Sequence, residues 1–164
     1  MTNKLKEIKN AYDGSSEFYN LRYKEIQFKK YNFALNNIQL EGKILDLGAG
    51  TGLLSKFIHN DLISLDISFN MLNKFKGKRI QADMSNIPIK KETFDYILSF
   101  SALMNSDNVE RTLNEIKRIL KKDGKIIISY LKKFDYIELI KNNFKILKQN
   151  IIDEDVMFIL EQKV

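Results

Sequence analysis

Short apolar runs alternate with amphipathic stretches from residue 43 to the end of the chain. The runs are rich in β-branched residues, which is typical of buried strands, and the stretches between them carry apolar residues at helical spacing. This alternation predicts parallel strands that are connected by helices. We expect strands at residues 43–47, 62–66, 79–82, 94–100, 125–130, 144–150 and 155–161. We expect helices at residues 53–59, 69–75, 109–120 and 134–142, and a looser turn around residues 84–88.

The connections between these elements indicate how the sheet ends. The helix over residues 109–120 is predicted to stop at Asp123 and Gly124, since glycine often follows the last turn of a helix. Only residues 151–154 separate the last two strands, and a parallel crossover needs a longer connection, so these strands should pair as an antiparallel hairpin. The sequence therefore predicts a three-layer, Rossmann-like α/β fold with a seven-stranded, mostly parallel sheet and an antiparallel last strand.

Residues 5–40 differ from the rest of the chain, because they follow the pattern of two amphipathic helices and show no strand pattern. A length of 164 residues suits one domain with a well-buried core. We therefore expect a single domain over residues 1–164, in which residues 1–42 form a helical cap and residues 43–164 form the core.

The composition is typical of a soluble globular protein, with 44% hydrophobic and 29% charged residues and no apolar run that approaches the ~20 residues of a membrane span. Residues 1–10 lack the apolar core of a signal peptide, so we expect a cytoplasmic location. The chain has no cysteine and one histidine, so no metal site is expected. A net charge of +6 suggests affinity for acidic partners such as RNA, but the lysine pairs are spread along the chain as on an ordinary solvated surface.

The first expected strand runs into three alternating glycines, Gly48, Gly50 and Gly52. Glycine lets the backbone turn sharply and lie directly against a bound molecule. The helix expected at residues 53–59 would point its free N–H groups and the positive end of its dipole into the same space. This turn is therefore predicted to bind a ligand.

Four neighbouring strands carry polar side chains at or near their carboxyl ends, where open α/β sheets bind ligands. These residues are Asp46, Asp66, Asp83 and Ser99. Asp66 lies 18 residues after Gly48 and is placed to accept hydrogen bonds from two adjacent ribose hydroxyls. Leu53 stands where the dinucleotide fingerprint requires its third glycine, which argues against NAD or FAD. An adenosine ligand without a pyrophosphate fits better.

Five segments carry a resemblance to a known family. They are Ile-Leu-Asp-Leu-Gly-Ala-Gly-Thr-Gly at 44–52, Leu-Asp-Ile-Ser-Phe-Asn-Met-Leu at 65–72, Ala-Asp-Met-Ser-Asn-Ile-Pro at 82–88, Phe-Asp-Tyr-Ile-Leu-Ser at 94–99 and Leu-Lys-Lys-Asp-Gly-Lys at 120–125. In this order and spacing they resemble the class I S-adenosylmethionine-dependent methyltransferases, in particular the UbiE-like, methyltransferase type 11 branch. The resemblance implies a seven-stranded sheet with a reversed last strand, S-adenosylmethionine as the methyl donor and S-adenosylhomocysteine as the product.

The resemblance also implies where the cofactor lies. Its methionine part would lie against the glycine turn, Asp66 would bind the ribose, and side chains after the second and third strands would line the adenine. Together with the other residues at the strand ends, the expected cofactor-binding residues are Asp46, Gly48, Ala49, Gly50, Asp66, Ile67, Met71, Asp83, Met84 and Ser99.

Some of these residues have a structural alternative. Asp46 would serve equally well as an acceptor for N–H groups of the glycine turn, and Met71 lies at helical spacing with Phe75, which also suits a core position. A helical stripe of Tyr12, Ser16, Tyr19 and Tyr23 is most simply a packing face. Related methyltransferases often carry similar tyrosines in a helix that covers the cofactor, so Tyr12 and Tyr19 are also candidates for closing the site over the methyl group.

Methyl transfer from a sulfonium is an in-line displacement that proceeds mainly through alignment and requires no metal. An oxygen or amine acceptor must still lose a proton, and we expect the assisting group in the loop after the fourth strand, over residues 99–107. The candidate catalytic residues are Tyr19, Ser99 and Asn105. Met104 and Asn105 stand where many UbiE-like relatives carry paired histidines, which argues against quinone or phenol methylation.

The short connection between Tyr130 and the helix expected near residue 134 leaves no insertion to cover the acceptor, so an open acceptor site is expected. An open site suits a macromolecule, either RNA or protein, or a site that is completed by a partner subunit or in a homodimer. The alternatives are a small metabolite, quinone-like or other, beneath the N-terminal helices, and a non-catalytic cofactor-binding subunit. An aminopropyl transferase is disfavoured, because residues 101–105 offer no acidic group to hold a polyamine.

Overall fold

A seven-stranded sheet forms the centre of the fold in the computed structural model, which describes residues 2–15, 18–36, 38–59 and 61–163. The strands are β1 (Lys43–Leu47), β2 (Asp61–Asp66), β3 (Lys78–Gln81), β4 (Phe94–Phe100), β5 (Leu120–Leu131), β6 (Phe144–Ile152) and β7 (Asp155–Gln162). They lie in the order β3-β2-β1-β4-β5-β7-β6. β7 is antiparallel to both of its neighbours, and the other pairs are parallel. The predicted sheet, including its reversed last strand, is confirmed.

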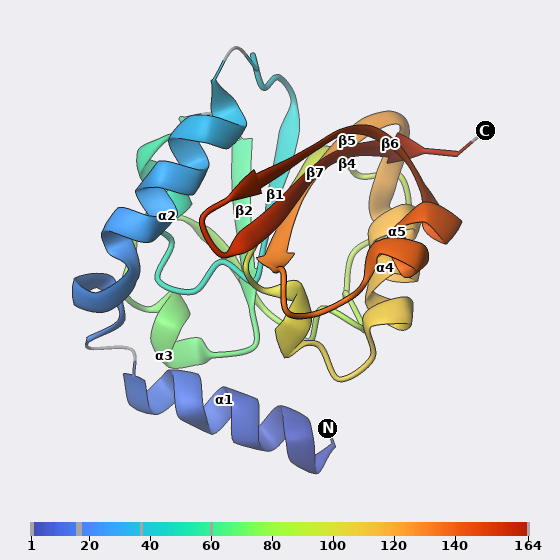
Figure 1. The fold of residues 1–164 in the computed structure, drawn as a ribbon. Helices are drawn as coiled ribbons and strands as arrows, with labels where there is room; N and C mark the ends of the chain where they lie inside the picture. Colours follow the sequence, from blue (N-terminus) through green and yellow to red (C-terminus); the bar gives the residue numbers. More distant parts are fainter. Residues whose placement is uncertain (1, 16–17, 37, 60, 164) are drawn as a thin grey trace.

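Helices cover both faces of this sheet. They are α1 (Asn3–Ser15), α2 (Tyr19–Leu35), α3 (Phe69–Leu72), α4 (Val109–Ile119) and α5 (Ile137–Asn143), with short 3₁₀ helices η1 (Leu53–Lys56) and η2 (Leu103–Asn105). Figure 1 shows α2 along one side of the sheet and α4 and α5 along the other. Buried side chains of β1 alternate between the two faces: Leu45 and Leu47 pack in the apolar cluster of α4 and α5, and Ile44 packs in that of α2. The fold therefore has three layers.

The end of α4 differs from the prediction. α4 ends at Ile119, and Leu120 is already extended, with φ −75° and ψ 136°, and pairs with Phe94 as the first residue of β5. Gly124 lies inside β5, where a Cβ atom would approach Leu120 Cδ1 to 2.6 Å. Close packing within the strand, and not the end of a helix, accounts for this glycine.

Two helices beside the predicted site are shorter than expected. Residues 53–59 contain only the single 3₁₀ turn of η1, in which the backbone N–H and the hydroxyl of Ser55 both donate to the Gly52 carbonyl oxygen, at 3.1 and 2.7 Å. α3 ends at Leu72, because Arg79 Nη1 donates to the carbonyl oxygens of Leu72 and Phe75, at 2.9 and 3.0 Å. The dipole of a long helix therefore does not contribute at the glycine turn.

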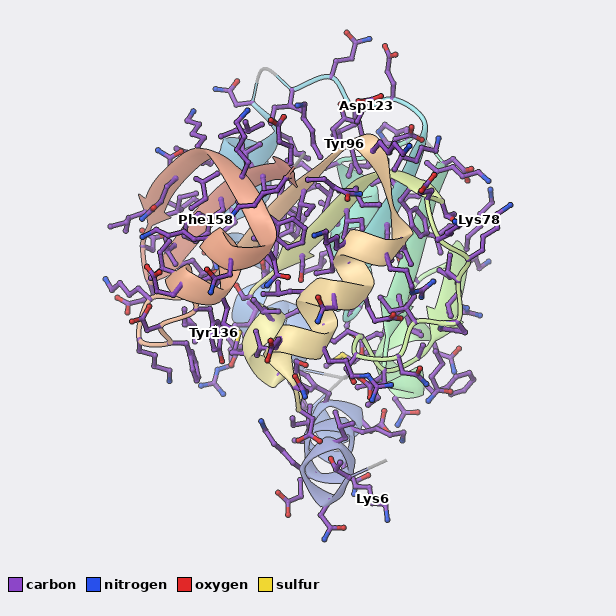
Figure 2. The ribbon with its side chains drawn as sticks, turned by 90° about the vertical axis from the view of Figure 1, so that its right-hand side faces the viewer. Lys6, Lys78, Tyr96, Asp123, Tyr136 and Phe158 are labelled. Carbon is purple, nitrogen blue, oxygen red and sulfur yellow. The ribbon has the colours of Figure 1, made fainter. Side chains whose placement is uncertain are left out.

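α1 lies across one end of the sheet, as Figures 1 and 2 show. In Figure 2, Lys6 of α1 is at the opposite end of the molecule from Tyr96, which lies near the start of β4. α1 therefore faces the carboxyl ends of the parallel strands. Lys4 Nζ donates to the Ser106 carbonyl oxygen at 3.2 Å, and the Ser68 hydroxyl donates to Asp13. Within the described ranges, no helix is long and apolar enough to cross a bilayer.

Candidate cofactor and acceptor site

The glycine turn after β1 is fixed by its backbone. Gly48, Gly50 and Gly52 have φ values of 77°, 54° and 73°, which residues other than glycine rarely adopt. A Cβ atom at Gly48 would lie 2.3 Å from the Cβ atom of Ala102, so the turn lies directly against the loop after β4. The Gly48 N–H donates to the Leu65 carbonyl oxygen at 2.8 Å, which holds the turn to β2.

Asp66 at the end of β2 links the glycine turn to the start of α3. Its Oδ2 accepts a hydrogen bond from the Gly50 N–H, and its Oδ1 accepts one from the Ser68 N–H, both at 2.8 Å. Burial raises the pKa of Asp66, and these two hydrogen bonds partly offset that effect. Each carboxylate oxygen keeps a further lone pair, so Asp66 can still accept two hydrogen bonds from a ligand.

Asp46 lies in β1 behind the glycine turn and is 4% exposed. Its Oδ2 has no hydrogen-bond partner among the described residues. Burial, with a further contribution from the charge of Asp66, raises the pKa of Asp46 to about 8. A buried carboxylate oxygen without a partner is costly, and a cationic ligand group would offset that cost.

A narrow cofactor cavity lies between this turn and α1, with a free volume of about 50 Å³. It is lined by Leu5, Ile8, Tyr12, Gly48, Gly50, Leu65, Asp66, Ile67, Ala82, Asp83, Met84, Phe100, Ser101, Ala102 and Asn105. This volume holds only a few water molecules. A nucleoside is larger than this volume, so the cavity must widen for one to bind.

The structure brings most of the predicted cofactor residues to this cavity and leaves four away from its lining. Met71 is fully buried in the core, and the Ser99 hydroxyl donates to the Leu47 carbonyl oxygen at 2.9 Å. Ala49 and Asp46 also do not line the cavity. The side chain of Tyr19 lies outside the described part of the structure.

Tyr12 and Asn105 close the cofactor cavity on the side of α1. Asn105 Nδ2 donates to the Tyr12 hydroxyl oxygen at 2.7 Å, which connects α1 to η2. Burial raises the pKa of Tyr12, so the phenol remains protonated near neutral pH. Both residues also line a second cavity.

This second, larger cavity has a volume of about 750 Å³, and we call it the acceptor cavity. Its walls come from α2, from the segment after β5 and from the β6-β7 turn. They comprise Tyr12, Phe18, Arg22, Tyr23, Ile26, Gln27, Lys30, Ser101, Met104, Asn105, Leu131, Lys133, Phe134, Asp153, Glu154 and Asp155. It shares Tyr12, Ser101 and Asn105 with the cofactor cavity, so the two spaces meet there.

A buried polar cluster lies where the two cavities meet. Lys30 Nζ donates to the Ser101 hydroxyl oxygen at 2.6 Å, and the Ser101 hydroxyl donates to Asp155 Oδ2, also at 2.6 Å. The Ser129 hydroxyl donates to the same Oδ2 at 2.8 Å. Lys30 Nζ lies 2.8 Å from Asp155 Oδ1, an ion pair without hydrogen-bond alignment. No local pattern in the sequence predicts this cluster, since its members come from four separate elements.

The comparisons with known proteins agree with this geometry. A family model described as a methyltransferase domain matches residues 45–128. The uncharacterized protein MJ1252 of Methanocaldococcus jannaschii is 32% identical, over 86% of this chain and 60% of that protein. The ubiquinone/menaquinone biosynthesis C-methyltransferase UbiE of Wigglesworthia glossinidia brevipalpis is 32% identical, over 70% of this chain and 49% of that protein.

A solved structure shows that the fold extends beyond these matches. A chain in the complex of the Haloferax volcanii Trm112 methyltransferase activator has a TM-score of 0.83 at 15% identity, over 96% of this chain and 98% of that one. The chain spans 51 to 64% of the length of three curated relatives that it matches. The segment that matches the family model contains the glycine turn, Asp66 and Asp83, and the fold brings these residues to one end of the sheet. The chain therefore belongs to the class I S-adenosylmethionine-dependent methyltransferases.

Proposed function

We propose that this chain transfers the methyl group of S-adenosylmethionine to a small-molecule acceptor. One observation carries the proposal: an acceptor cavity of about 750 Å³ meets the cofactor cavity at Tyr12, Ser101 and Asn105. This volume falls in the range of roughly 300 to 1,000 Å³ that is usual for small-ligand sites. α2 forms one wall of this cavity, and the sequence-based expectation of an open site did not include that wall.

The residues of the cofactor cavity fit S-adenosylmethionine. Asp66 would bind the ribose hydroxyls with its remaining lone pairs, and Ile67 and Met84 would supply apolar surface for the adenine. Asp83 lines the same end of the cavity. Asp46 does not line the cavity, but its Oδ2 is buried behind the glycine turn with no hydrogen-bond partner among the described residues, so it would attract the ammonium group of the methionine part.

A proton release is expected from Asp46 when S-adenosylhomocysteine binds. At pH 7 the Asp46 carboxyl of the free chain is protonated, since its pKa is about 8. An ammonium group near Oδ2 would lower that pKa, so up to about one proton should leave on binding. Calorimetry at pH 7 in two buffers of different ionisation enthalpy measures the number of protons released. This release should be absent at higher pH and in Asp46→Asn. Equal observed binding enthalpies in the two buffers would mean that no proton is released, and would indicate that Asp46 is only structural.

The walls of the acceptor cavity favour a small and largely apolar acceptor over a macromolecule. Tyr23, Ile26, Met104, Leu131 and Phe134 supply aromatic and aliphatic surface. Apolar walls with a few polar groups are typical of small-ligand sites. RNA recognition would instead require phosphate contacts along a positively charged surface.

Charge at the mouth of the cavity favours an acceptor with an anionic group. The acidic residues of the β6-β7 turn are neutralised by lysines, because Asp153 pairs with Lys29 at 2.7 Å and Glu154 lies 3.7 Å from Lys132. In the described part of the chain, Arg22 and Lys133 have no carboxylate partner. The surplus charge is therefore positive, and an aromatic acid is the simplest acceptor that matches both the walls and the mouth.

The chain would act chiefly by alignment. S-adenosylmethionine, when bound, supplies an electrophilic methyl group. The Tyr12–Asn105 hydrogen bond connects α1 to η2 at the point where the cavities meet. Holding two reactants in line can lower a barrier by up to ~7 to 11 kcal/mol.

The test combines cofactor binding with methyl transfer. We expect S-adenosylhomocysteine to bind, and labelled methyl to pass from S-adenosylmethionine to 4-hydroxybenzoate or 4-aminobenzoate. Ile26→Trp places a larger side chain in the wall of the acceptor cavity, from an exposed position of α2, and should reduce transfer while leaving S-adenosylhomocysteine affinity unchanged. Phe33→Trp, also on an exposed position of α2 but outside this cavity, is the matched control.

Parallel reactions should contain total RNA and total protein, because relatives of this fold differ in what they act on. Label in RNA or protein that Ile26→Trp does not reduce would contradict a small acceptor in this cavity. Transfer that appears only when a second subunit is added would support the partner-dependent alternative that the Haloferax volcanii complex suggests.

A further inference from the structure

We propose that Ser101 and Asp155 accept the proton of the methylated nucleophile, so that the acceptor is an N–H or O–H nucleophile. This inference rests on the proposed function, because it assigns chemistry to the place where the cofactor and acceptor cavities meet. Ser101 lines both cavities, whereas Ser129, which binds the same carboxylate oxygen, lines neither. Ser101 is thus the member of the cluster that is open to both reactants and connected to a buried carboxylate.

The hydrogen bonds of Ser101 leave one position free for a substrate proton. A hydroxyl has one donor and two acceptor positions. The donor is used on Asp155 Oδ2 at 2.6 Å, and one acceptor position is used by Lys30 Nζ at 2.6 Å. The second acceptor position can receive an N–H or O–H from a molecule in the acceptor cavity.

The backbone at Ser101 supports this role. Its φ of 52° lies in the left-handed region, which a serine adopts only when the surroundings hold it there. The Ser101 N–H is fixed by the Ser129 carbonyl oxygen at 2.9 Å, and its hydroxyl is fixed by Lys30 and Asp155. Strained backbone at the end of a strand is common where a side chain must be aimed at a reaction.

The nucleophile's lone pair forms the bond to the methyl carbon, and the S–CH₃ bond breaks with its electron pair remaining on sulfur. The nucleophile's proton passes to Ser101 Oγ while the hydroxyl proton passes to Asp155 Oδ2. The products are the methylated acceptor, S-adenosylhomocysteine, an intact serine and a protonated Asp155, whose proton later leaves to water. A hydroxyl oxygen, or the nitrogen of an aromatic amine, makes its own proton strongly acidic as it gains the methyl group. A carboxylate is therefore a sufficient base to take that proton.

Other titratable groups face this cluster and must be considered in any pH profile. Lys30 and Tyr23 come from α2, Tyr12 comes from α1, and Asp153 and Glu154 come from the β6-β7 turn. Lys30 donates to Ser101 and pairs with Asp155, so it orients the relay and does not accept the substrate proton.

Two kinds of acceptor separate proton removal from alignment. 4-Hydroxybenzoate and 4-aminobenzoate lose a proton on methylation, whereas isonicotinate carries no proton on its ring nitrogen. The variants are Ser101→Gly, which removes the hydroxyl and accepts the positive φ without strain, and Asp155→Asn, which keeps the shape of the side chain. Ser64→Ala is the control, since Ser64 is also a buried serine, lies in β2 outside this cluster and lines neither cavity.

We expect Ser101→Gly and Asp155→Asn to reduce kcat with the two benzoates by about 100-fold or more, in the usual range of general base catalysis. Their kcat with isonicotinate should change by no more than about threefold, as should every rate of Ser64→Ala. With 4-hydroxybenzoate the variants should gain rate as the pH rises, because the phenol must then ionise by itself, and the wild-type rate should depend less on pH.

An equal loss of kcat with all three acceptors in Ser101→Gly and Asp155→Asn would overturn the inference. The cluster would then have a structural role alone. Binding of S-adenosylhomocysteine without transfer to any of the three would also overturn it, while leaving the cofactor site intact. No binding of S-adenosylhomocysteine to the wild-type chain would instead contradict the proposed function itself.

Discussion

Asp66→Ala should weaken the binding of S-adenosylhomocysteine by about 100-fold or more, which corresponds to about 2.7 kcal/mol. Two effects add in this variant. The side chain would bind the ribose hydroxyls, and hydrogen bonds to a charged group contribute about 1.5 to 3 kcal/mol each. It also holds the Gly50 and Ser68 N–H groups at 2.8 Å, so its removal loosens the turn against which the methionine part would lie.

Asp61→Ala is the matched control for this prediction, because it removes an aspartate from the other end of β2. Asp61 forms an exposed ion pair with Lys78 at 2.5 Å, and such pairs contribute little. Calorimetry should therefore show a change of no more than about twofold in Asp61→Ala. Asp66→Asn, which keeps one acceptor oxygen, should fall between Asp66→Ala and the wild type. An affinity of Asp66→Ala close to that of the wild type would remove Asp66 from the cofactor site.

The cofactor side of the site could be predicted from the sequence because its signals are local. Gly48, Gly50 and Gly52 occur within five residues, and Asp66 and Asp83 follow strands whose apolar pattern is clear. A parallel sheet brings the carboxyl ends of neighbouring strands together, so these residues had to lie near one another. The predicted helices at residues 53–59 and 69–75 were too long, also for a local reason. The side chains of Ser55 and Arg79 donate to carbonyl groups that a longer helix would use.

The acceptor side could not be predicted in the same way. Lys30 appears in the sequence as one of two adjacent lysines, and Asp155 appears as the first residue of the last expected strand. Only the position of α2 against the β6-β7 turn brings them to within 2.8 Å, across 125 positions of the chain. The sequence-based candidates near the end of β4 were Ser99, in the strand, and Asn105, in the loop after it, whereas the residue of this region in the buried cluster is Ser101.

Lys30→Met should be strongly destabilising, with a loss of about 3 to 5 kcal/mol in the free energy of unfolding. Lys30 and Asp155 are 5% and 0% exposed at their side chains, so Asp155 would keep a buried charge without its cation. Among the described residues, only the Ser101 and Ser129 hydroxyls would then remain bound to that carboxylate. Chemical denaturation followed by circular dichroism measures the loss, and the melting temperature should fall with it.

The neighbouring lysine provides a matched control. Lys29 pairs with Asp153 at 2.7 Å, but both side chains are largely exposed, so Lys29→Met should cost no more than about 1 kcal/mol. The double variant Lys30→Met with Asp155→Leu should recover much of the stability, because replacing a whole buried pair by apolar side chains avoids the unpaired charge. That recovery without any methyl transfer would show that the ion pair is dispensable for the fold and retained for the reaction. If Lys30→Met cost no more than Lys29→Met, α2 would not be held by this ion pair, and the acceptor cavity would lack its fixed wall.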